Sequence, residues 1–374
     1  MTGPEELAHR LRADGYLTEV WYEPFVYVRR EDFIPDRIWV QADDGYRRLE
    51  RDENPGRWLS LVYDDVALVT QVEDEHNGLA LVPSSSSSMP RVVATMLETL
   101  DVADGMSVLE IGTGTGYNAA LLSHRLGDAR VTSIEIDPAV AETARERLAK
   151  AGHHPNVITG DGTTAAPGQR PVDRVIVTCA LGSVPYALVN HTRPGGRIVL
   201  PWGTGLYNGV LLRLDVHADG SASGPVIGDC AFMWNRAEAV HRDVTTVIHH
   251  DDPAEVSHTG LDPRRVLGDE NAAFVTGLLV PDCRYSVGHG PNNEFTLWLA
   301  DHRTGSWASI DYTPGAATYE TAQFGPRRLW EEAEAAMRWW QSAGEPVRTR
   351  FGITITSTDQ WTWLDTPDLR MTAG

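Results

Sequence analysis

The residues with the clearest chemical signature lie between positions 108 and 116. A short apolar run, 108–111, carries an acid at Glu110, and three glycines follow at alternate positions: Gly112, Gly114 and Gly116. Glycine lets the backbone approach a ligand closely, and a helix that begins after the loop directs its free N–H groups toward that ligand. Strand, glycine loop and helix in this order are typical of an α/β unit that binds a nucleotide-like ligand.

The spacing of these glycines indicates which ligand is expected. G-x-G-x-G is neither the dinucleotide fingerprint G-x-G-x-x-G nor the phosphate loop G-x-x-x-x-G-K-S/T, and the loop holds no lysine to meet a phosphate. An acid two residues before the first glycine suits S-adenosylmethionine, whose sulfonium is cationic and which has no phosphate. We therefore expect Glu110 to face the positively charged methionine end of this cofactor. A tight turn in some other α/β fold is the alternative.

Later strands carry further candidates at their carboxyl ends. Glu135 ends a predicted strand about twenty residues beyond the loop, where an acid can accept both ribose hydroxyls. Asp161 lies between two glycines and can accept a hydrogen bond from the adenine amino group. Cys179 follows a fourth strand and can floor the pocket, but no histidine or basic residue adjoins it, so we do not expect a nucleophile. The predicted cofactor-binding residues are Glu110, Gly112, Thr113, Gly114, Gly116, Glu135, Ile136, Asp161, Gly162 and Cys179.

Alternating strand and helix patterns position these residues. Strands are expected at 108–111, 130–137, 156–159, 171–178, 197–201 and 210–216, and helices at 90–100, 118–126, 139–151 and 188–191. Asp137 before Pro138 is typical of a helix N-cap. The alternation predicts a mostly parallel sheet covered on both faces. The expected fold class is α/β, a Rossmann-like class I S-adenosylmethionine-dependent methyltransferase.

The flanking segments follow other patterns. A short helix at 7–15 and strands at 61–63 and 66–70 form an N-terminal lobe; strands at 271–280, 294–299, 306–312 and 351–358 and a helix at 327–343 form an α+β extension. Trp339, Trp361 and Trp363 belong either to the core of this extension or to a peptide-docking surface. We expect three domains: 1–89, the N-terminal lobe with a substrate loop; 90–235, the cofactor-binding core; and 236–374, an α+β domain for peptide recognition.

A run of five serines, 84–88, lies between Pro83 and a helical pattern that starts at Pro90. One interpretation is a flexible linker followed by a helix cap. The functional interpretation is an ordered loop of hydroxyls that faces the active site.

Composition excludes several classes of function. The formal net charge is −20 and the pI about 5.0, a field that repels phosphate backbones and disfavours nucleic-acid binding. The three cysteines are far apart without a C-x-x-C, which predicts a reduced, cytoplasmic protein with no metal site. His153 and His154 are expected to be solvated turn residues. No apolar run approaches the ~18 residues of a membrane span, and nothing in the sequence indicates an oligomeric state.

The ordered set of motifs between Tyr63 and Leu214 resembles protein-L-isoaspartate O-methyltransferase. The matching segments are Tyr63-Asp64-Asp65, the serine run, the glycine loop, Gly160-Asp161-Gly162 and Pro194-Gly195-Gly196. The serine run falls where the family has Gly-Gln-Thr-Ile-Ser-Gln-Pro: Ser86 aligns with the threonine and Ser88 with the serine, whereas Met89 replaces the second glutamine. The resemblance implies S-adenosylmethionine as cofactor and Ser88, with Ser86, as the catalytic residues that orient a substrate carboxylate.

Two features differ from the family pattern, and they narrow the resemblance to one branch of the family. The substrate loop is nearly all serine, and the chain continues far beyond the point where repair enzymes are expected to end. Both resemble the branch associated with ribosomally made peptides such as lanthipeptides and graspetides, in which an aspartate of a cyclised peptide is methylated and the ester collapses through succinimide. The expected partner is therefore a modified precursor peptide. The alternatives are a general isoaspartate repair enzyme, methyl transfer to a small molecule or to tRNA, and a non-enzymatic binding module. The net negative charge of the chain argues against tRNA.

The chemistry requires few groups from the chain. A side-chain carboxylate with a pKa near 4 is ionised at neutral pH and needs no general base to attack a methyl group. Catalysis is then mostly positioning of the donor and the nucleophile.

Overall fold

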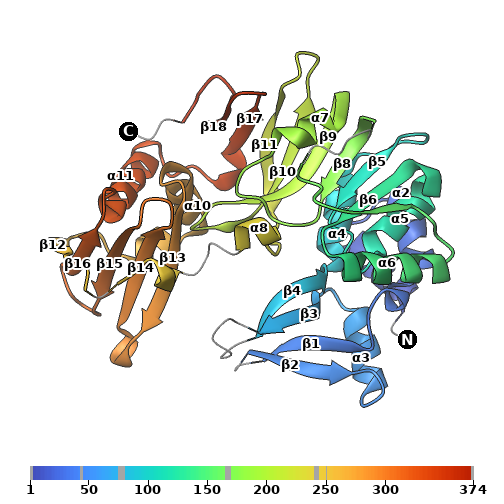
Figure 1. The fold of residues 1–374 in the computed structure, drawn as a ribbon, viewed down its shortest axis with the longest axis horizontal. Helices are drawn as coiled ribbons and strands as arrows, with labels where there is room; N and C mark the ends of the chain where they lie inside the picture. Colours follow the sequence, from blue (N-terminus) through green and yellow to red (C-terminus); the bar gives the residue numbers. More distant parts are fainter. Residues whose placement is uncertain are drawn as a thin grey trace. The chain divides into compact units, whose positions relative to one another are not determined.

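The strands in the described part of the chain form three sheets (Figure 1). The computed structural model describes residues 3–42, 45–74, 81–164, 170–239, 244–249 and 251–371. The strand orders are β18-β17-β11-β10-β9-β8-β5-β6-β7 in a nine-stranded sheet, β2-β1-β3-β4 in a four-stranded sheet and β12-β16-β15-β14-β13 in a five-stranded sheet.

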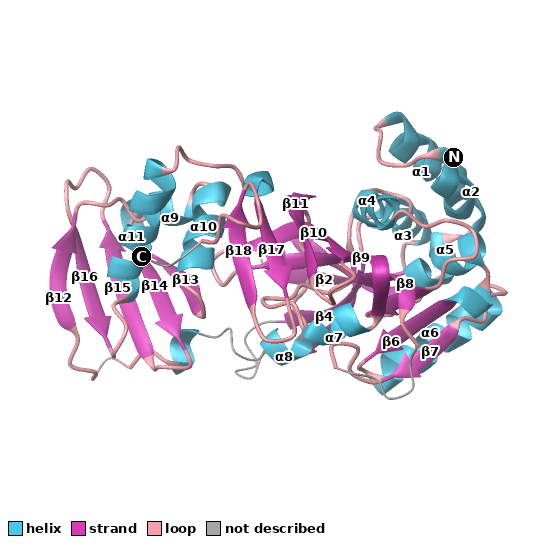
Figure 2. Cartoon of the chain, turned by 90° about the horizontal axis from the view of Figure 1, so that it is seen from above, coloured by secondary structure: helices cyan, strands magenta, loops and turns pink. Residues whose placement is uncertain are grey.

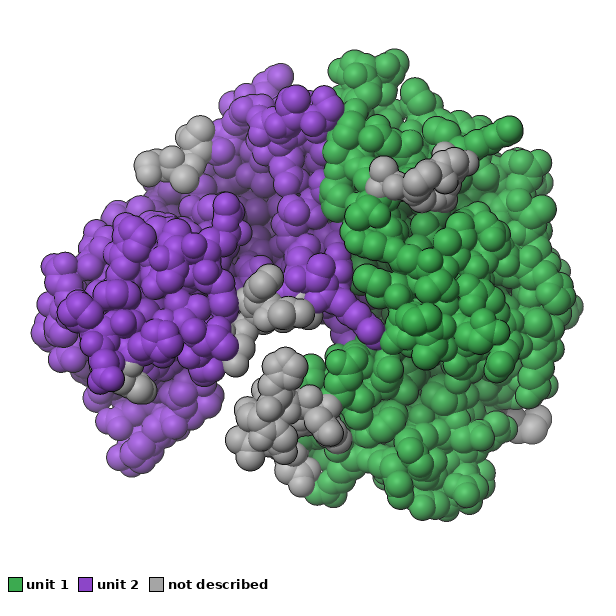
Figure 3. Space-filling model, viewed as in Figure 1, with its two compact units in different colours: residues 1–179, 185–200, 213–222 green, residues 180–184, 201–212, 223–374 purple. Residues whose placement is uncertain are grey.

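Contacts divide the chain into two units (Figure 3). Unit 1 comprises residues 1–179, 185–200 and 213–222, and unit 2 comprises 180–184, 201–212 and 223–374. Both units are discontinuous in sequence, whereas the expected domains are three consecutive segments. The three-domain division stays a prediction.

The methyltransferase-like part of unit 1 has the expected alternation of strands and helices (Figure 2). Its elements are α4 Pro90–Leu100, β5 Val108–Ile111, α5 Tyr117–Leu126, β6 Val131–Glu135, α6 Pro138–Lys150, β7 Asn156–Thr159, β8 Val172–Val177 and α7 Tyr186–Asn190. Of the strands that follow, β9 Thr192–Gly203 and β10 Asn208–Val216 are divided between the two units, and β11 Ala222–Asp229 belongs to unit 2 from residue 223 onward. β5 pairs in parallel with β6 and β8, and β6 pairs in parallel with β7. The α/β fold class is confirmed.

Local sequence explains why these elements begin where they do. The Asp137 side chain accepts hydrogen bonds from the backbone N–H groups of Ala139 (2.8 Å) and Val140 (3.3 Å), so it caps α6 as expected. Pro90 occupies the first turn of α4, where its missing N–H has no partner to lose. All four residues of β5 are buried, as a central parallel strand requires.

The N-terminal part of unit 1 corrects two expectations. Its elements are α1 Pro4–Ala13, α2 Glu19–Tyr27, β1 Arg37–Ala42, β2 Gly45–Glu50, α3 Pro55–Val62, β3 Leu68–Asp74 and β4 Leu81–Ser87. The strand expected at 61–63 is wrong: these residues end α3, which Asn54 caps through its bond from the Arg57 N–H (3.1 Å). The serine run is also not a loop, because Ser84–Ser87 belong to β4, where Ser86 pairs with Val69 of β3.

Unit 2 carries the five-stranded sheet with its helices. Its further elements are α8 Arg236–Ala239, β12 Glu255–Thr259, α9 Arg264–Leu267, α10 Glu270–Leu279, β13 Cys283–His289, β14 Phe295–Asp301, β15 Ser306–Tyr312, β16 Tyr319–Phe324, α11 Leu329–Ser342, β17 Phe351–Ile355 and β18 Gln360–Leu364. Helix α11 packs on β14, β15 and β16. Across both units, short 3-10 helices lie at Arg30–Asp32, Asp128–Arg130, Val244–Thr246, Pro291–Asn293 and Arg348–Arg350.

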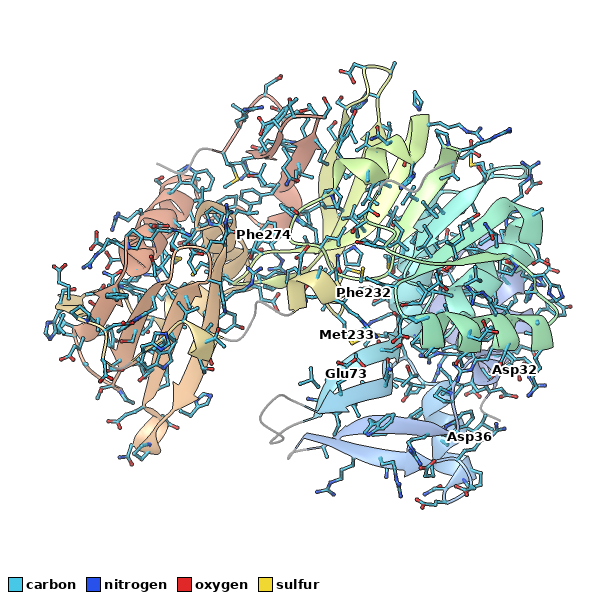
Figure 4. The ribbon with its side chains drawn as sticks, in the orientation of Figure 1. Asp32, Asp36, Glu73, Phe232, Met233 and Phe274 are labelled. Atoms are coloured by element: carbon cyan, nitrogen blue, oxygen red, sulfur yellow. The ribbon has the colours of Figure 1, made fainter. Side chains whose placement is uncertain are left out.

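The strand expected at 271–280 is wrong, because this segment is helix α10. Asp269 caps it by accepting hydrogen bonds from the N–H groups of Asn271 (2.8 Å) and Ala272 (3.0 Å). Phe274, labelled in Figure 4, packs edge-on against Trp202 and Phe351, with ring centroids 5.6 and 5.9 Å apart. A helix buried on all sides lacks the one-sided apolar pattern, so its sequence resembles a buried strand.

Gly352 in β17 provides a test of packing in unit 2. A Cβ at this position would overlap the Trp363 ring and lie 2.6 Å from the Gly224 carbonyl oxygen, whereas a Cβ at Gly228 in β11 would meet nothing within 4 Å. We expect Gly352→Ala to lower the free energy of unfolding by about 1–3 kcal/mol through overpacking. Gly228→Ala is the matched control and should change stability little. Denaturant unfolding measures both, and equal stabilities would contradict this account of the packing.

Candidate active site

The glycine loop after β5 has a backbone that only glycine adopts readily. Gly112, Gly114 and Gly116 have φ values of +94°, +54° and +91°. A Cβ at Gly112 would lie 2.5 Å from Oγ1 of Thr178, and one at Gly116 would lie 3.3 Å from Leu148. The loop therefore presents its backbone without side chains, as a ligand that binds close to the chain requires.

Glu110 is fully buried at the carboxyl end of β5. Its carboxylate accepts hydrogen bonds from Nδ2 of Asn118 (2.7 Å) and from the Ser133 hydroxyl (2.5 Å). Burial raises the pKa of Glu110 to about 7, against the opposing effect of these two hydrogen bonds. A buried carboxylate without a cationic partner favours the binding of a positive group, and this fits the ammonium and sulfonium of S-adenosylmethionine.

Glu135 ends β6 and is linked directly to the glycine loop. One carboxylate oxygen accepts a hydrogen bond from the Gly114 N–H (2.9 Å) and the other accepts one from the Asp137 N–H (3.1 Å). Thr113 lies on the same side, where its hydroxyl is 2.6 Å from the Ser133 hydroxyl. Glu110, Ser133, Thr113 and Glu135 thus form a connected polar floor beneath the loop.

The remaining predicted cofactor residues lie at the ends of β6, β7 and β8. Ile136 is 44% exposed and follows Glu135, so its side chain is available to a ligand. Asp161 accepts hydrogen bonds from the N–H (2.9 Å) and hydroxyl (2.6 Å) of Thr163, and these bonds fix the turn after β7. A Cβ at Gly162 would lie 2.8 Å from Ile111, so that position needs glycine for packing. Cys179 is half-buried and reduced. The cofactor roles of all ten residues stay predictions.

The serine segment lies against the glycine loop. A Cβ at Gly114 would be 3.7 Å from the carbonyl oxygen of Ser86, so β4 passes directly over the loop. Burial alternates along the run: Ser85 and Ser87 are buried, whereas Ser86 and Ser88 are partly exposed. Neither the Ser86 nor the Ser88 hydroxyl bonds to another residue in the described part of the chain. The two serines predicted to act on substrate are therefore those with accessible hydroxyls.

Arg30, which sequence reasoning missed, holds this segment in place. Its guanidinium is fully buried and donates hydrogen bonds to the carbonyl oxygens of Ser88 (2.9 Å) and Ser87 (3.4 Å). It also donates to the carbonyls of Val62 (2.8 Å) and Val66 (3.1 Å). Burial lowers the pKa of Arg30 to about 10, so the side chain remains charged at neutral pH. Arg30 lies between Arg29 and Glu31, in a charged stretch that is typical of solvated surface, so no local pattern signals its burial.

Comparison with known proteins decides the family. The family model for protein-L-isoaspartate(D-aspartate) O-methyltransferase matches residues 44–235, about half of the chain. The chain belongs to this family. A protein-L-isoaspartate O-methyltransferase of Methanopyrus kandleri is 38% identical over 233 residues, which cover 61% of this chain and 89% of that protein. One of Pyrococcus horikoshii is 39% identical over 157 residues, covering 41% of this chain and 70% of the relative.

Solved structures extend the likeness in fold. A protein-L-isoaspartate O-methyltransferase structure has a TM-score of 0.55 and 20% identity, covering 97% of this chain and 100% of that chain. This likeness shows the fold over nearly the whole chain, whereas the two relatives above cover 61% and 41% of it. The branch that the extra length suggests stays a prediction.

This family member is a carboxyl O-methyltransferase that depends on S-adenosylmethionine. The described residues include no group of three or more metal-ligating side chains and no helix long and apolar enough to cross a membrane.

The raised pKa of Glu110 makes cofactor affinity depend on pH. The cationic cofactor favours the ionised form, so the apparent Kd should rise about tenfold per pH unit as the pH falls well below 7. Glu110→Gln should remove this slope and weaken binding about tenfold or more at pH 8. The Ser133 hydroxyl can turn to accept from the new amide, which keeps the variant folded. Calorimetric titration with S-adenosylmethionine, without a methyl acceptor and at several pH values, measures both effects.

The exposed Glu142 is the matched control, and Glu142→Gln should leave the pH slope unchanged. Stability supplies a second readout without cofactor. Between the ordinary carboxyl pKa of 4.5 and about 7, the folded protein holds the Glu110 proton more tightly than the unfolded chain. Its contribution to the free energy of unfolding is therefore lost as the pH rises through that window. An unchanged pH slope in Glu110→Gln would refute this role.

Arg30→Lys tests whether the guanidinium positions the serine segment. An ammonium cannot reach all the carbonyls that Arg30 bonds, so we expect the free energy of unfolding to fall by about 2–4 kcal/mol. Turnover should fall while cofactor affinity is retained, because the glycine loop is untouched. Arg29→Lys is the control, since Arg29 is 59% exposed and a lysine at this position can still pair with Glu31. Equal effects of Arg30→Lys and Arg29→Lys on stability and turnover would refute the positioning role of Arg30.

Proposed function

We propose that this enzyme methylates the free α-carboxylate of isoaspartyl residues in proteins or peptides. The observation that carries the proposal is the position of the serine segment: Ser86 lies against Gly114 of the cofactor loop in a chain that belongs to the isoaspartyl methyltransferase family. Three free cysteines, Cys179, Cys230 and Cys283, support a reduced, cytoplasmic setting as part of the proposal.

The proposed chemistry follows from these positions. S-Adenosylmethionine, when bound, supplies an electrophilic methyl group. Glu110 and Glu135 hold the cofactor from beneath the glycine loop, the first by charge and the second through hydrogen bonds to the ribose. The hydroxyls of Ser88 and Ser86 donate hydrogen bonds to the substrate carboxylate, which is already ionised and needs no base. Orientation of the nucleophile is the main catalytic contribution of the chain.

The methyl ester then reacts further without help from the residues of this enzyme. The backbone nitrogen that follows the methylated residue attacks the ester carbonyl, a C–N bond forms, and methanol leaves with the proton. The resulting succinimide takes up water and opens to aspartyl or isoaspartyl peptide. This sequence explains why the site needs no second catalytic group.

A second candidate substrate is an ordinary aspartate in a ribosomally made, cyclised peptide, as in lanthipeptide or graspetide maturation. The serine run favours it, because the family threonine and glutamine are replaced by Ser86 and Met89. The relatives compared here favour the general isoaspartyl activity. Mass spectrometry of two parallel reactions separates the two substrates: one with a linear isoaspartyl peptide, the other with a cyclised peptide that carries ordinary aspartate.

Transfer of a methyl group to the linear isoaspartyl peptide supports the main proposal. Methyl gain followed by net loss of water on the cyclised peptide alone would replace it with the maturation activity. No transfer to either peptide would refute both.

Ser88→Ala tests the proposed contact with substrate. Loss of a hydrogen bond to a charged group should lower turnover about tenfold or more, whereas cofactor affinity should stay within about twofold. Ser84→Ala is the matched control in the same run, because the Ser84 hydroxyl is buried and bonds to none of the residues that the structure describes. Steady-state methyl transfer and cofactor titration measure the two quantities. A parallel loss of both in Ser88→Ala would instead indicate a role in folding of β4.

A further inference from the structure

Unit 2 contains a cavity of about 810 Å³ that the proposed methyl transfer does not use. Its lining comes from residues 182–183 and 202–205, the end of α10, the start of β13, the end of β14 and β18. All these segments belong to unit 2. A cavity of this size is in the range that holds a small molecule or a few residues of a peptide.

Arg284 is a basic residue of this cavity whose hydrogen-bonding capacity is only partly used. Its Nε is buried and has no hydrogen-bond partner among the residues that the structure describes. One terminal nitrogen makes a long contact, 3.4 Å, with the carbonyl oxygen of Cys283, and the guanidinium carbon lies 5.8 Å from the Trp234 ring centroid. A buried donor on a cation without an acceptor is costly, so such a group usually marks a missing partner.

The acids around the cavity are already paired with other groups. Asp282 pairs with Arg303 at 2.8 Å, and Asp301 pairs with Arg327 at 2.9 Å. Glu238 accepts a hydrogen bond from the Gly182 N–H at 2.8 Å. Within the described residues, Arg284 therefore has no carboxylate of its own, although three acids line the same cavity.

The backbone opposite Arg284 is arranged to leave this guanidinium room. A Cβ at Gly205 would overlap both the Cys283 carbonyl oxygen and a terminal nitrogen of Arg284. Only glycine lets the 203–205 turn lie this close to the arginine. Trp202 closes the wall beside it and is held by a hydrogen bond from its Nε1 to the Gly182 carbonyl (3.1 Å).

We propose that this cavity binds a carboxylate of the peptide substrate, with Arg284 as the anchor. The inference rests on the proposed function, which makes the ligand a peptide. A guanidinium presents parallel N–H donors that match a carboxylate. One unpaired positive charge beside three acids suits a single negative charge, whereas a dianionic phosphate would be repelled. The carboxylate belongs either to an acidic side chain away from the methylated residue or to the peptide C-terminus.

Binding of short peptides to the full chain, saturated with S-adenosylhomocysteine, tests the anchor. Three pentapeptides without isoaspartate serve as probes: one with a single Glu and an amidated C-terminus, one with Gln and a free C-terminus, and one with Gln and an amidated C-terminus. We expect the third to bind at least tenfold more weakly than one of the first two, and the better of those two identifies the source of the carboxylate. Equal binding of all three would overturn the proposal.

Two variants assign the effect to Arg284. Arg284→Gln should weaken the preferred peptide at least tenfold, whereas Arg338→Gln, an equal charge change at an exposed position of α11, should not. Arg284→Lys keeps the charge but loses the planar fork, so an intermediate affinity is expected. Unchanged affinity in a folded Arg284→Gln variant would overturn the proposal. If that variant does not fold, binding of the three peptides to the unaltered protein still tests the proposal.

Kinetics separate this inference from the proposed function. With an isoaspartyl peptide that carries the preferred second carboxylate, Arg284→Gln should raise KM at least tenfold and leave kcat unchanged. With an isoaspartyl peptide that lacks it, neither constant should change. Failure of the unaltered enzyme to methylate any isoaspartyl peptide would refute the proposed function, whereas equal KM effects on both peptides would refute only the anchor.

Discussion

The burial of Arg30 is the constraint on which the substrate side of the active site depends. Its guanidinium bonds the carbonyls of two chain segments that are distant in sequence, 62–66 and 87–88. A buried cation is tolerated when acceptors meet its donors, and backbone carbonyls meet both terminal nitrogens of Arg30, although its Nε has no partner within the described residues. The end of β4 is therefore fixed by a side chain outside it, which explains how five consecutive serines can hold one conformation against the glycine loop.

Glu110 shows the opposite arrangement on the cofactor side. Its burial is only partly compensated by Asn118 and Ser133, and the pKa rises accordingly. A buried carboxylate with a raised pKa is stabilised most by a cation that the ligand supplies. The glycines beside it remove the side chains that would otherwise occupy the approach. The two sides of the site thus differ: hydrogen bonds from Arg30 hold the backbone of the serine segment, whereas the buried charge of Glu110 gains a partner only when a cationic ligand binds.

The sequence predicted the parallel core because each of its elements carries a local signal. Alternation of buried strands and capped helices located β5 to β8 and α4 to α6 within a few residues. The errors fall where tertiary burial overrides the local pattern. Segment 271–280 is apolar on every side and resembles a strand, although the Asp269 cap was a readable helix signal. A run of serines is typical of a flexible linker, and only the pairing of Ser85–Ser87 with β3 makes it part of a strand. Arg30 carried no signal, since burial of an arginine depends on distant carbonyls.

Selectivity among the carboxylates of a peptide must come from how the substrate is bound. Every aspartyl, glutamyl and isoaspartyl carboxylate is ionised at neutral pH, so reactivity toward a methyl donor does not distinguish them. A site that lacks a base and relies on orientation can choose among them only by how the peptide is held. Two accessible hydroxyls, Ser86 and Ser88, supply little of that discrimination. Further contacts along the peptide are therefore required, and an unpaired arginine in a cavity of unit 2 is the kind of group that provides one.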